Sequence, residues 1–124
     1  MEKQHKILIV DDEVSIVLAL ENILYNKGFM VEKAYDGKKG IQIAKDFKPD
    51  LILLDVMMPF INGFEFANCI RNDKNLQDTK IIFITAKGEM NDKKDGYSKG
   101  GDDYIVKPFS TEKLLSRIDF LISS

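Results

Sequence analysis

Short apolar runs rich in β-branched residues alternate along the whole chain with longer segments of helical periodicity. This alternation is typical of βαβ units built on a parallel sheet. We expect strands at residues 6–10, 30–35, 50–54, 80–85 and 104–107. The first, third and fourth of these are almost wholly apolar, as strands covered by helices on both faces are. They are therefore predicted to lie at the centre of the sheet, with the other two at its edges.

Helices are expected between the strands. The first has an apolar stripe made of Ile16, Leu20, Ile23 and Leu24, and Gly28 is predicted to end it. The last has a similar stripe made of Leu114, Ile118 and Leu121, with Ser110 as its predicted N-cap. Residues 89–99 form the weakest predicted helix, because they offer few apolar side chains and contain Gly96.

Composition limits the class of protein. A chain of 124 residues can bury enough apolar surface to fold as a single domain, residues 1–124, without a disulfide or a structural metal. The net charge of -2, without a basic cluster, argues against direct binding of nucleic acid or of an anionic membrane surface. The sole cysteine, Cys69, is expected to be a small buried residue. The N-terminal apolar run is too short for a signal peptide or a membrane span, so a cytoplasmic protein is expected.

Polar residues stand where the predicted strands end. Asp11 and Asp12 follow the first strand, Asp55 the third, Thr85 closes the fourth and Lys107 the fifth. In open α/β sheets, ligands bind beyond the carboxyl ends of the strands. These groups are therefore predicted to converge on one rim of the sheet.

A single aspartate after a strand is ordinarily a helix cap or a turn residue, and for Asp11 or Asp12 alone that reading is as good as a functional one. Three clustered carboxylates repel one another and call for a cation, a proton or a phosphoryl group. Oxygen ligands without histidine or cysteine suit Mg²⁺. Acids after the first strand would repel a bound anion, which excludes a nucleotide or flavin site of the glycine-rich type. An aspartate that itself becomes phosphorylated remains, and Asp55 is the central candidate.

Five motifs carry a family resemblance across essentially the whole chain. They are "ILIVDDE", "PDLILLDVMMP", "NGFE", "IIFITA" and "GGDDYIVKPF". In order and spacing they resemble the receiver domain of two-component response regulators, the CheY-like superfamily. The resemblance implies an α/β, doubly wound, flavodoxin-like (βα)5 fold: a five-stranded parallel sheet of order 2-1-3-4-5 with five helices.

The resemblance also implies roles for individual residues. Asp55 would accept a phosphoryl group from a sensor histidine kinase or a phosphotransfer protein. Asp12 would bind Mg²⁺ directly, Asp11 would position the ion through water, and the backbone carbonyl of Met57 would complete the protein ligands. The remaining roles fall on Lys107, Thr85 and Tyr104: Lys107 would pair with the phosphoryl oxygens across a cis Lys107-Pro108 bond, Thr85 would hydrogen-bond the phosphoryl group, and Tyr104 would be an aromatic switch. The readout would be the surface of helix four, strand five and helix five.

Two other functions could use the same residues but fit the sequence less well. A Mg²⁺-dependent phosphohydrolase with an aspartate nucleophile would need that nucleophile in an Asp-x-Asp arrangement after the first strand, together with a cap domain, and the sequence shows neither. A receiver-like domain that only binds a protein is disfavoured by the intact Asp12, Asp55, Thr85 and Lys107. The expected function is a phosphoacceptor switch that is not an enzyme, with slow self-catalysed loss of the phosphoryl group.

The partners implied by the resemblance extend beyond the phosphodonor to an effector domain or a downstream target protein. A phosphorylation-dependent homodimer is left open. The charge pattern of helix four to helix five in receivers of winged-helix regulators is incomplete here. Lys93 and Lys113 are both basic, and Asn91 stands in place of an acid, although Asp103 and Arg117 match.

Overall fold

Strands and helices alternate in the computed structural model, which describes residues 4–86 and 100–123. In chain order the elements are β1 (Lys6–Val10), α1 (Val14–Asn26), β2 (Met30–Ala34), α2 (Gly37–Phe47), β3 (Leu51–Asp55), α3 (Gly63–Arg71), β4 (Lys80–Ala86), β5 (Asp103–Lys107) and α5 (Thr111–Ile122). The predicted helix at residues 89–99 lies outside the described residues. The predicted strand positions are confirmed to within one residue at either end.

The sheet is parallel throughout, with the strand order β2-β1-β3-β4-β5. This confirms the predicted doubly wound α/β fold, including β2 and β5 at the edges. The strand order reverses next to β1, where β2 and β3 leave on opposite sides. Such a reversal point is where ligands bind in folds of this kind.

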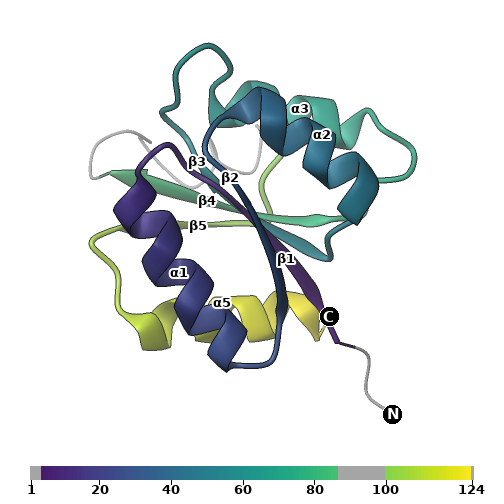
Figure 1. Ribbon diagram of the computed structural model, residues 1–124. Coiled ribbons are helices and arrows are strands. Elements are labelled where there is room, and N and C mark those ends of the chain that lie inside the picture. The colour runs from purple at the N-terminus through teal and green to yellow at the C-terminus, as the bar shows by residue number, and fades with distance from the viewer. Residues whose placement is uncertain (1–3, 87–99, 124) are drawn as a thin grey trace.

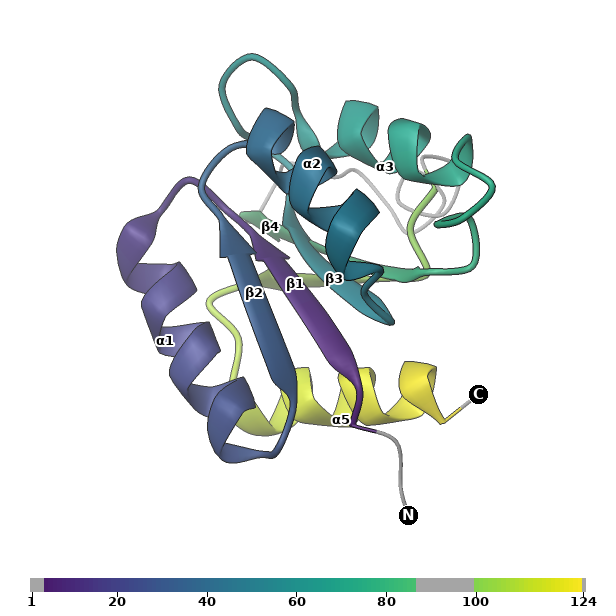
Figure 2. The same ribbon diagram turned by 45° about the vertical axis from the view of Figure 1, so that its right-hand side comes forward.

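Helices cover both faces of the sheet. Figures 1 and 2 show α1 and α5 packed on one face, and α2 and α3 on the other. Alternate residues of each strand therefore enter two separate apolar layers. On β3, for example, Leu51 and Leu53 are buried toward α1 and α5, whereas Ile52 and Leu54 are buried toward α2 and α3. The central strands are held between two cores, which fixes the position of their carboxyl ends.

The helix ends follow from local sequence. Ser110 is the N-cap of α5, as predicted, since its hydroxyl accepts a hydrogen bond from the Lys113 backbone at 3.0 Å. Gly28 follows the end of α1 with a φ of 92°, a conformation that glycine adopts without strain. In α1 the buried residues are Val17, Leu20 and Leu24. Ile16 and Ile23 are only half-buried, so the predicted stripe is rotated slightly from the real one.

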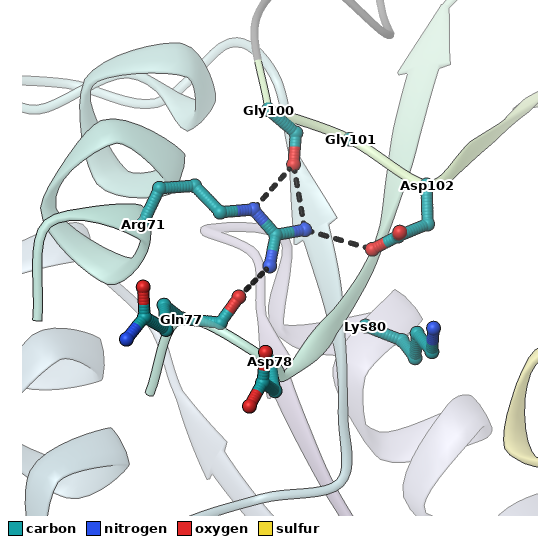
Figure 3. A pocket seen from close by; sticks show the side chains of 7 residues that line it. All are labelled: Arg71, Gln77, Asp78, Lys80, Gly100, Gly101 and Asp102. Atoms are coloured by element: carbon teal, nitrogen blue, oxygen red, sulfur yellow. Dashed lines mark hydrogen bonds and ion pairs between the residues drawn. The ribbon is translucent and has the colours of Figure 1, made fainter. Parts of the chain in front are cut away.

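Arg71, the last residue of α3, ties together the amino ends of β4 and β5 (Figure 3). All five of its N–H groups donate hydrogen bonds. Two go to the backbone oxygen of Gly100, and one each to the backbone oxygens of Gln77 and Thr79 and to Oδ2 of Asp102. The same Asp102 oxygen accepts from the backbone of Ile81 at 2.8 Å. Arg71 lines a surface hollow of about 580 Å³, but its guanidinium is fully used by the protein, which indicates a structural role.

Two smaller observations bear on the sequence predictions. Asp103 forms an ion pair with Arg117 of α5 at 3.4 Å, within one chain. Lys93 and Asn91 lie outside the described residues, so the rest of that charge pattern stays a prediction. Across residues 4–86 and 100–123, no helix combines the length and the apolar character needed to cross a membrane.

Candidate functional site

Three carboxylates meet at the carboxyl ends of β1 and β3. Asp55 is the last residue of β3, and Asp11 and Asp12 follow β1 directly. One carboxylate oxygen from each lies within 4.8 Å of the others. Asp11 and Asp55 are 0% and 4% exposed, whereas Asp12 is open to solvent. The structure thus brings together the three acids predicted from the sequence, with two of them shielded from water.

Lys107, the last residue of β5, reaches the same rim. Its ammonium nitrogen lies 3.5 Å from Oδ2 of Asp11 and 3.9 Å from Oδ1 of Asp55. The Lys107-Pro108 peptide bond is cis, as the family resemblance implied. The predicted convergence of Lys107 with the acids is therefore found in the structure.

Glu13 is a fourth acid that sequence reasoning did not assign. Its side chain accepts a hydrogen bond from Lys107 Nζ at 3.1 Å, which is shorter than either ion pair of Lys107 with an aspartate. The backbone N–H of Glu13 also donates to Oδ1 of Asp11 at 2.9 Å. The sequence did carry a signal for Glu13, which is the third acid of the "DDE" run at the end of the motif "ILIVDDE".

The electrostatics of the site follow from burial and from like charges. Burial, and after it the charge of Asp11, raises the pKa of Asp55 to about 7. Burial also raises the pKa of Asp11, although a hydrogen bond from the Glu13 backbone works against this. For Lys107, burial alone would lower the pKa, but the neighbouring carboxylates outweigh it and the pKa is raised. The rim therefore favours binding of a further cation in place of a proton.

The residues present fit a hard divalent cation. Among the described residues, none donates a hydrogen bond to Oδ2 of Asp11, although this oxygen is buried. A buried carboxylate oxygen ordinarily accepts a hydrogen bond, whereas within the described residues Oδ2 forms the longer ion pair with Lys107 at 3.5 Å, so this oxygen retains capacity for a ligand. All side-chain donors of the cluster are carboxylate oxygens, which Mg²⁺ prefers over nitrogen or sulfur. The acid cluster thus has the ligand chemistry predicted for magnesium.

Thr85, Tyr104 and Met57 occupy different parts of the rim. Thr85 is 1% exposed near the end of β4, one residue beyond Ile84, the register partner of Asp55. Tyr104 lies near the start of β5, farther from the rim than Lys107. It pairs with Phe83 of β4 and is half-buried in the apolar layer between the sheet and helices α2 and α3. Met57 follows the rim in the loop toward α3, and its side chain is 62% exposed. The roles predicted for these three residues remain predictions.

The loop that carries Met57 is packed tightly against Asp55. Gly63, the first residue of α3, donates its backbone N–H to the Val56 carbonyl at 2.8 Å. A Cβ on Gly63 would lie 2.5 Å from the backbone oxygen of Asp55, closer than real Cβ atoms come. Asn62 begins α3 with a capping box to Glu65. Glycine at position 63 and the capped helix therefore hold the backbone on both sides of Met57.

Comparison with known proteins identifies the family. The response regulator receiver domain matches residues 7–119. Response regulator ArlR of Staphylococcus saprophyticus is 49% identical over 113 residues, which cover 91% of this chain and 50% of that protein. The chain spans about half the length of the curated relatives it matches.

Solved structures agree with this assignment. The chemotaxis response regulator CheY4 of Vibrio cholerae superposes with a TM-score of 0.89 at 33% identity, covering 96% of this chain and 99% of that one. The receiver domain of sensor histidine kinase PA1611 from Pseudomonas aeruginosa has a TM-score of 0.88 at 28% identity, covering 98% and 100%. That structure has a magnesium ion coordinated in its active site cleft. The chain belongs to the response regulator receiver domains, the two-component signalling switches that are phosphorylated on an aspartate and generally use Mg²⁺ at an acidic site.

Proposed function

We propose that Asp55 is the phosphoacceptor of this receiver domain and that it takes its phosphoryl group from a histidine kinase or a histidine phosphotransfer protein. One observation carries the proposal: the buried carboxylate of Asp55 lies within 4.8 Å of those of Asp11 and Asp12, and Lys107 lies 3.9 Å from it on another strand. This arrangement supplies a nucleophile, a set of ligands for a metal ion and a fixed positive charge in one place.

In the proposed reaction, an oxygen of ionised Asp55 forms a bond to the phosphorus atom of the donor. The bond from phosphorus to the donor's histidine nitrogen breaks, and the nitrogen keeps the electron pair. Charge on the transferred phosphoryl oxygens is offset by the Lys107 ammonium. The pKa of this group, ordinarily far above 7, is raised further by the neighbouring carboxylates, so it is protonated at neutral pH. The product is an aspartyl phosphate on Asp55.

The metal ligands would be the side chains of Asp12 and Asp55, Asp11 through water, and the backbone carbonyl of Met57. Bound Mg²⁺ would supply further positive charge to the phosphoryl oxygens. Binding of the ion would also keep Asp55 ionised at neutral pH, since a nearby cation lowers the pKa of a carboxyl. Oδ2 of Asp11, which is buried and accepts no hydrogen bond from the described residues, supports this part of the proposal.

The proposed output is a change at the surface that the helix predicted from the sequence at residues 89–99 would form with β5 and α5. A phosphoryl group adds a charge of about -1.5 to -2 and strong acceptor oxygens. Thr85 would move toward it and Tyr104 would turn inward after Thr85. Shifting a two-state equilibrium from 1:99 to 99:1 takes about 5.5 kcal/mol. A few charge-assisted hydrogen bonds at about 1.5 to 3 kcal/mol each could supply this.

The whole chain, residues 1–124, is proposed to be one receiver domain that acts in the cytoplasm as a switch and is not an enzyme in its own right. Loss of the phosphoryl group would be slow, by attack of water on phosphorus, with the Asp55 oxygen as the leaving group. An effector domain or a separate target protein would read the switch, and a homodimer stays open. The second candidate, a Mg²⁺-dependent phosphohydrolase, would use the same nucleophile with rapid turnover.

The test is intact-protein mass spectrometry after incubation with acetyl phosphate and Mg²⁺. The proposal expects one labile phosphoryl adduct in the wild type and none in Asp55→Asn. Sustained release of phosphate at many turnovers per minute would favour the phosphohydrolase instead.

A further inference from the structure

Glu13 connects the acid cluster to Lys107 in two ways. Its backbone N–H donates to Oδ1 of Asp11, and its carboxylate accepts from Lys107 Nζ. Glu13 is the N-cap residue of α1, a position where a side-chain oxygen commonly accepts from the first turn of the helix. It makes no such bond. The carboxylate is therefore directed to Lys107 and not to its own helix.

Lys107 lies closer to Glu13 than to Asp55, whose phosphoryl group it is proposed to stabilise. The Nζ distances are 3.1 Å to Glu13, 3.5 Å to Asp11 and 3.9 Å to Asp55. Only Glu13 is at hydrogen-bonding distance. Its oxygen is not part of the three-acid cluster. A metal ion held by the three aspartates would thus leave Glu13 as a free competitor for the ammonium.

We propose that Glu13 is a positioning residue that holds Lys107 in the unphosphorylated protein and competes with the incoming phosphoryl group for its ammonium. The inference rests on Asp55 being the phosphoacceptor. For Lys107 to pair with phosphoryl oxygens on Asp55, its nitrogen must move toward Asp55 and loosen the bond to Glu13. Glu13 therefore slows phosphorylation by stabilising the resting position of Lys107.

The expected size of the effect follows from exposure. The Glu13 side chain is 56% exposed and that of Lys107 20% exposed. Loss of an exposed or half-exposed lysine–carboxylate pair changes an equilibrium by up to about fivefold. Replacing Glu13 by glutamine removes the charge and keeps the shape of the side chain. We expect the rate of phosphorylation to rise by about three- to fivefold.

The experiment measures the initial rate of adduct formation with acetyl phosphate at saturating Mg²⁺, for the wild type and for Glu13→Gln. Glu21→Gln is the matched control, because Glu21 also pairs with a lysine, Lys33, at 2.8 Å, but away from the rim. It changes the net charge equally and is expected to react at the wild-type rate. Thermal unfolding of each variant checks that the fold is retained.

Glu13 could also slow the reaction by simple repulsion of the anionic donor. Repeating the Glu13→Gln substitution in a protein that lacks Lys107 separates this repulsion from an effect through Lys107. In Lys107→Ala, measured over longer incubations, adding Glu13→Gln is expected to change the rate by less than about 1.5-fold. Equal rates for wild type and Glu13→Gln, or the same acceleration in both backgrounds, would overturn the inference and leave Asp55 as phosphoacceptor. A wild type that forms no adduct would overturn the proposed function and this inference with it.

Discussion

The ammonium nitrogen of Lys107 lies 3.9 Å from Oδ1 of Asp55, although the two residues end different strands, β5 and β3, with β4 between them. The charge of Lys107 also lowers the pKa of Asp55, against the larger effects of burial and Asp11. Lys107 is thus placed to act on Asp55 without being one of the metal ligands.

Replacing Lys107 should slow chemistry while leaving metal binding in place. In Lys107→Ala at saturating Mg²⁺, we expect phosphorylation by acetyl phosphate to be slower on the order of 10²-fold, because a preorganised charge at the phosphoryl oxygens is lost. The proposed ligands Asp11, Asp12 and Asp55 remain in this variant, so calorimetry should still detect Mg²⁺ binding. Lys33→Ala, which breaks a lysine pair elsewhere, is the control. A wild-type rate in Lys107→Ala would contradict the assigned role.

The stability of the metal-free protein should depend on pH through Asp55. Burial and the charge of Asp11 raise its pKa from 3.8 to about 7. Between these values the folded protein keeps a proton that the unfolded chain has lost. The contribution of Asp55 to stability is therefore greatest below about pH 4 and is lost as pH rises through 7. The free energy of unfolding is therefore expected to fall by about 2 to 4 kcal/mol over this pH range.

Asp55→Asn removes this dependence. With a metal chelator present, we expect the variant to exceed the wild type in free energy of unfolding by about 2 to 4 kcal/mol at pH 8, and to match it more nearly at pH 4. Denaturant unfolding at the two pH values measures this. Excess Mg²⁺ should raise the stability of the wild type at pH 8 and leave Asp55→Asn less affected. Parallel pH profiles for the two proteins would count against the raised pKa.

Gly63→Ala should disturb the metal site through the backbone. Its Cβ would come 2.5 Å from the Asp55 carbonyl oxygen, so the loop after β3 must shift. We expect a loss of about 1 to 3 kcal/mol in stability and weaker Mg²⁺ binding. Gly28→Ala is the control, since its φ of 92° also makes alanine costly but its Cβ would meet nothing within 4 Å. If both variants bind Mg²⁺ as the wild type does, the packing of Gly63 does not govern the site.

Arg71→Lys should destabilise the opposite end of the sheet. Lysine cannot reproduce the planar set of five N–H donors, so carbonyls of Gln77, Thr79 and Gly100 lose partners. A drop of about 2 to 4 kcal/mol in the free energy of unfolding is expected, with Mg²⁺ affinity unchanged. Gln77→Ala, which leaves the backbone carbonyl in place, should shift stability by less than about 0.5 kcal/mol. Equal stability of Arg71→Lys and the wild type would refute this role.

Much of the fold could be read from the sequence because its strands differ so clearly in pattern. Strands buried on both faces are continuous apolar runs, such as residues 7–10 and 51–54, and this pattern predicted their central places in the sheet. Helix faces were less certain. Cys69 was predicted to be buried and is exposed, because α3 buries Phe66, Ala67 and Ile70 on the other side. A single apolar-looking residue does not reveal which face of a helix it lies on.

The candidate site was predictable as a set of strand ends, but not in its pairings. The sequence indicated that Asp11, Asp55 and Lys107 would share a rim, since parallel strands end at one edge. It did not indicate that Lys107 bonds Glu13, because this depends on side-chain positions at the start of α1. Contacts between residues distant in the chain need three-dimensional geometry.

Mapping the adduct along the chain shows whether Asp55 carries the phosphoryl group. The wild type is treated with acetyl phosphate and Mg²⁺, the acyl phosphate is trapped by borohydride reduction, and the peptides are sequenced by mass spectrometry. If Asp55 is the phosphoacceptor, a single reduced residue is expected at position 55, with no reduced residue in Asp55→Asn. Labelling should be normal in Asp46→Asn, an exposed aspartate in the last turn of α2, at the end of that helix far from the rim. Reduction at Asp11, Asp12 or any other carboxylate of the wild type, with Asp55 intact, would contradict the assignment of Asp55 as phosphoacceptor.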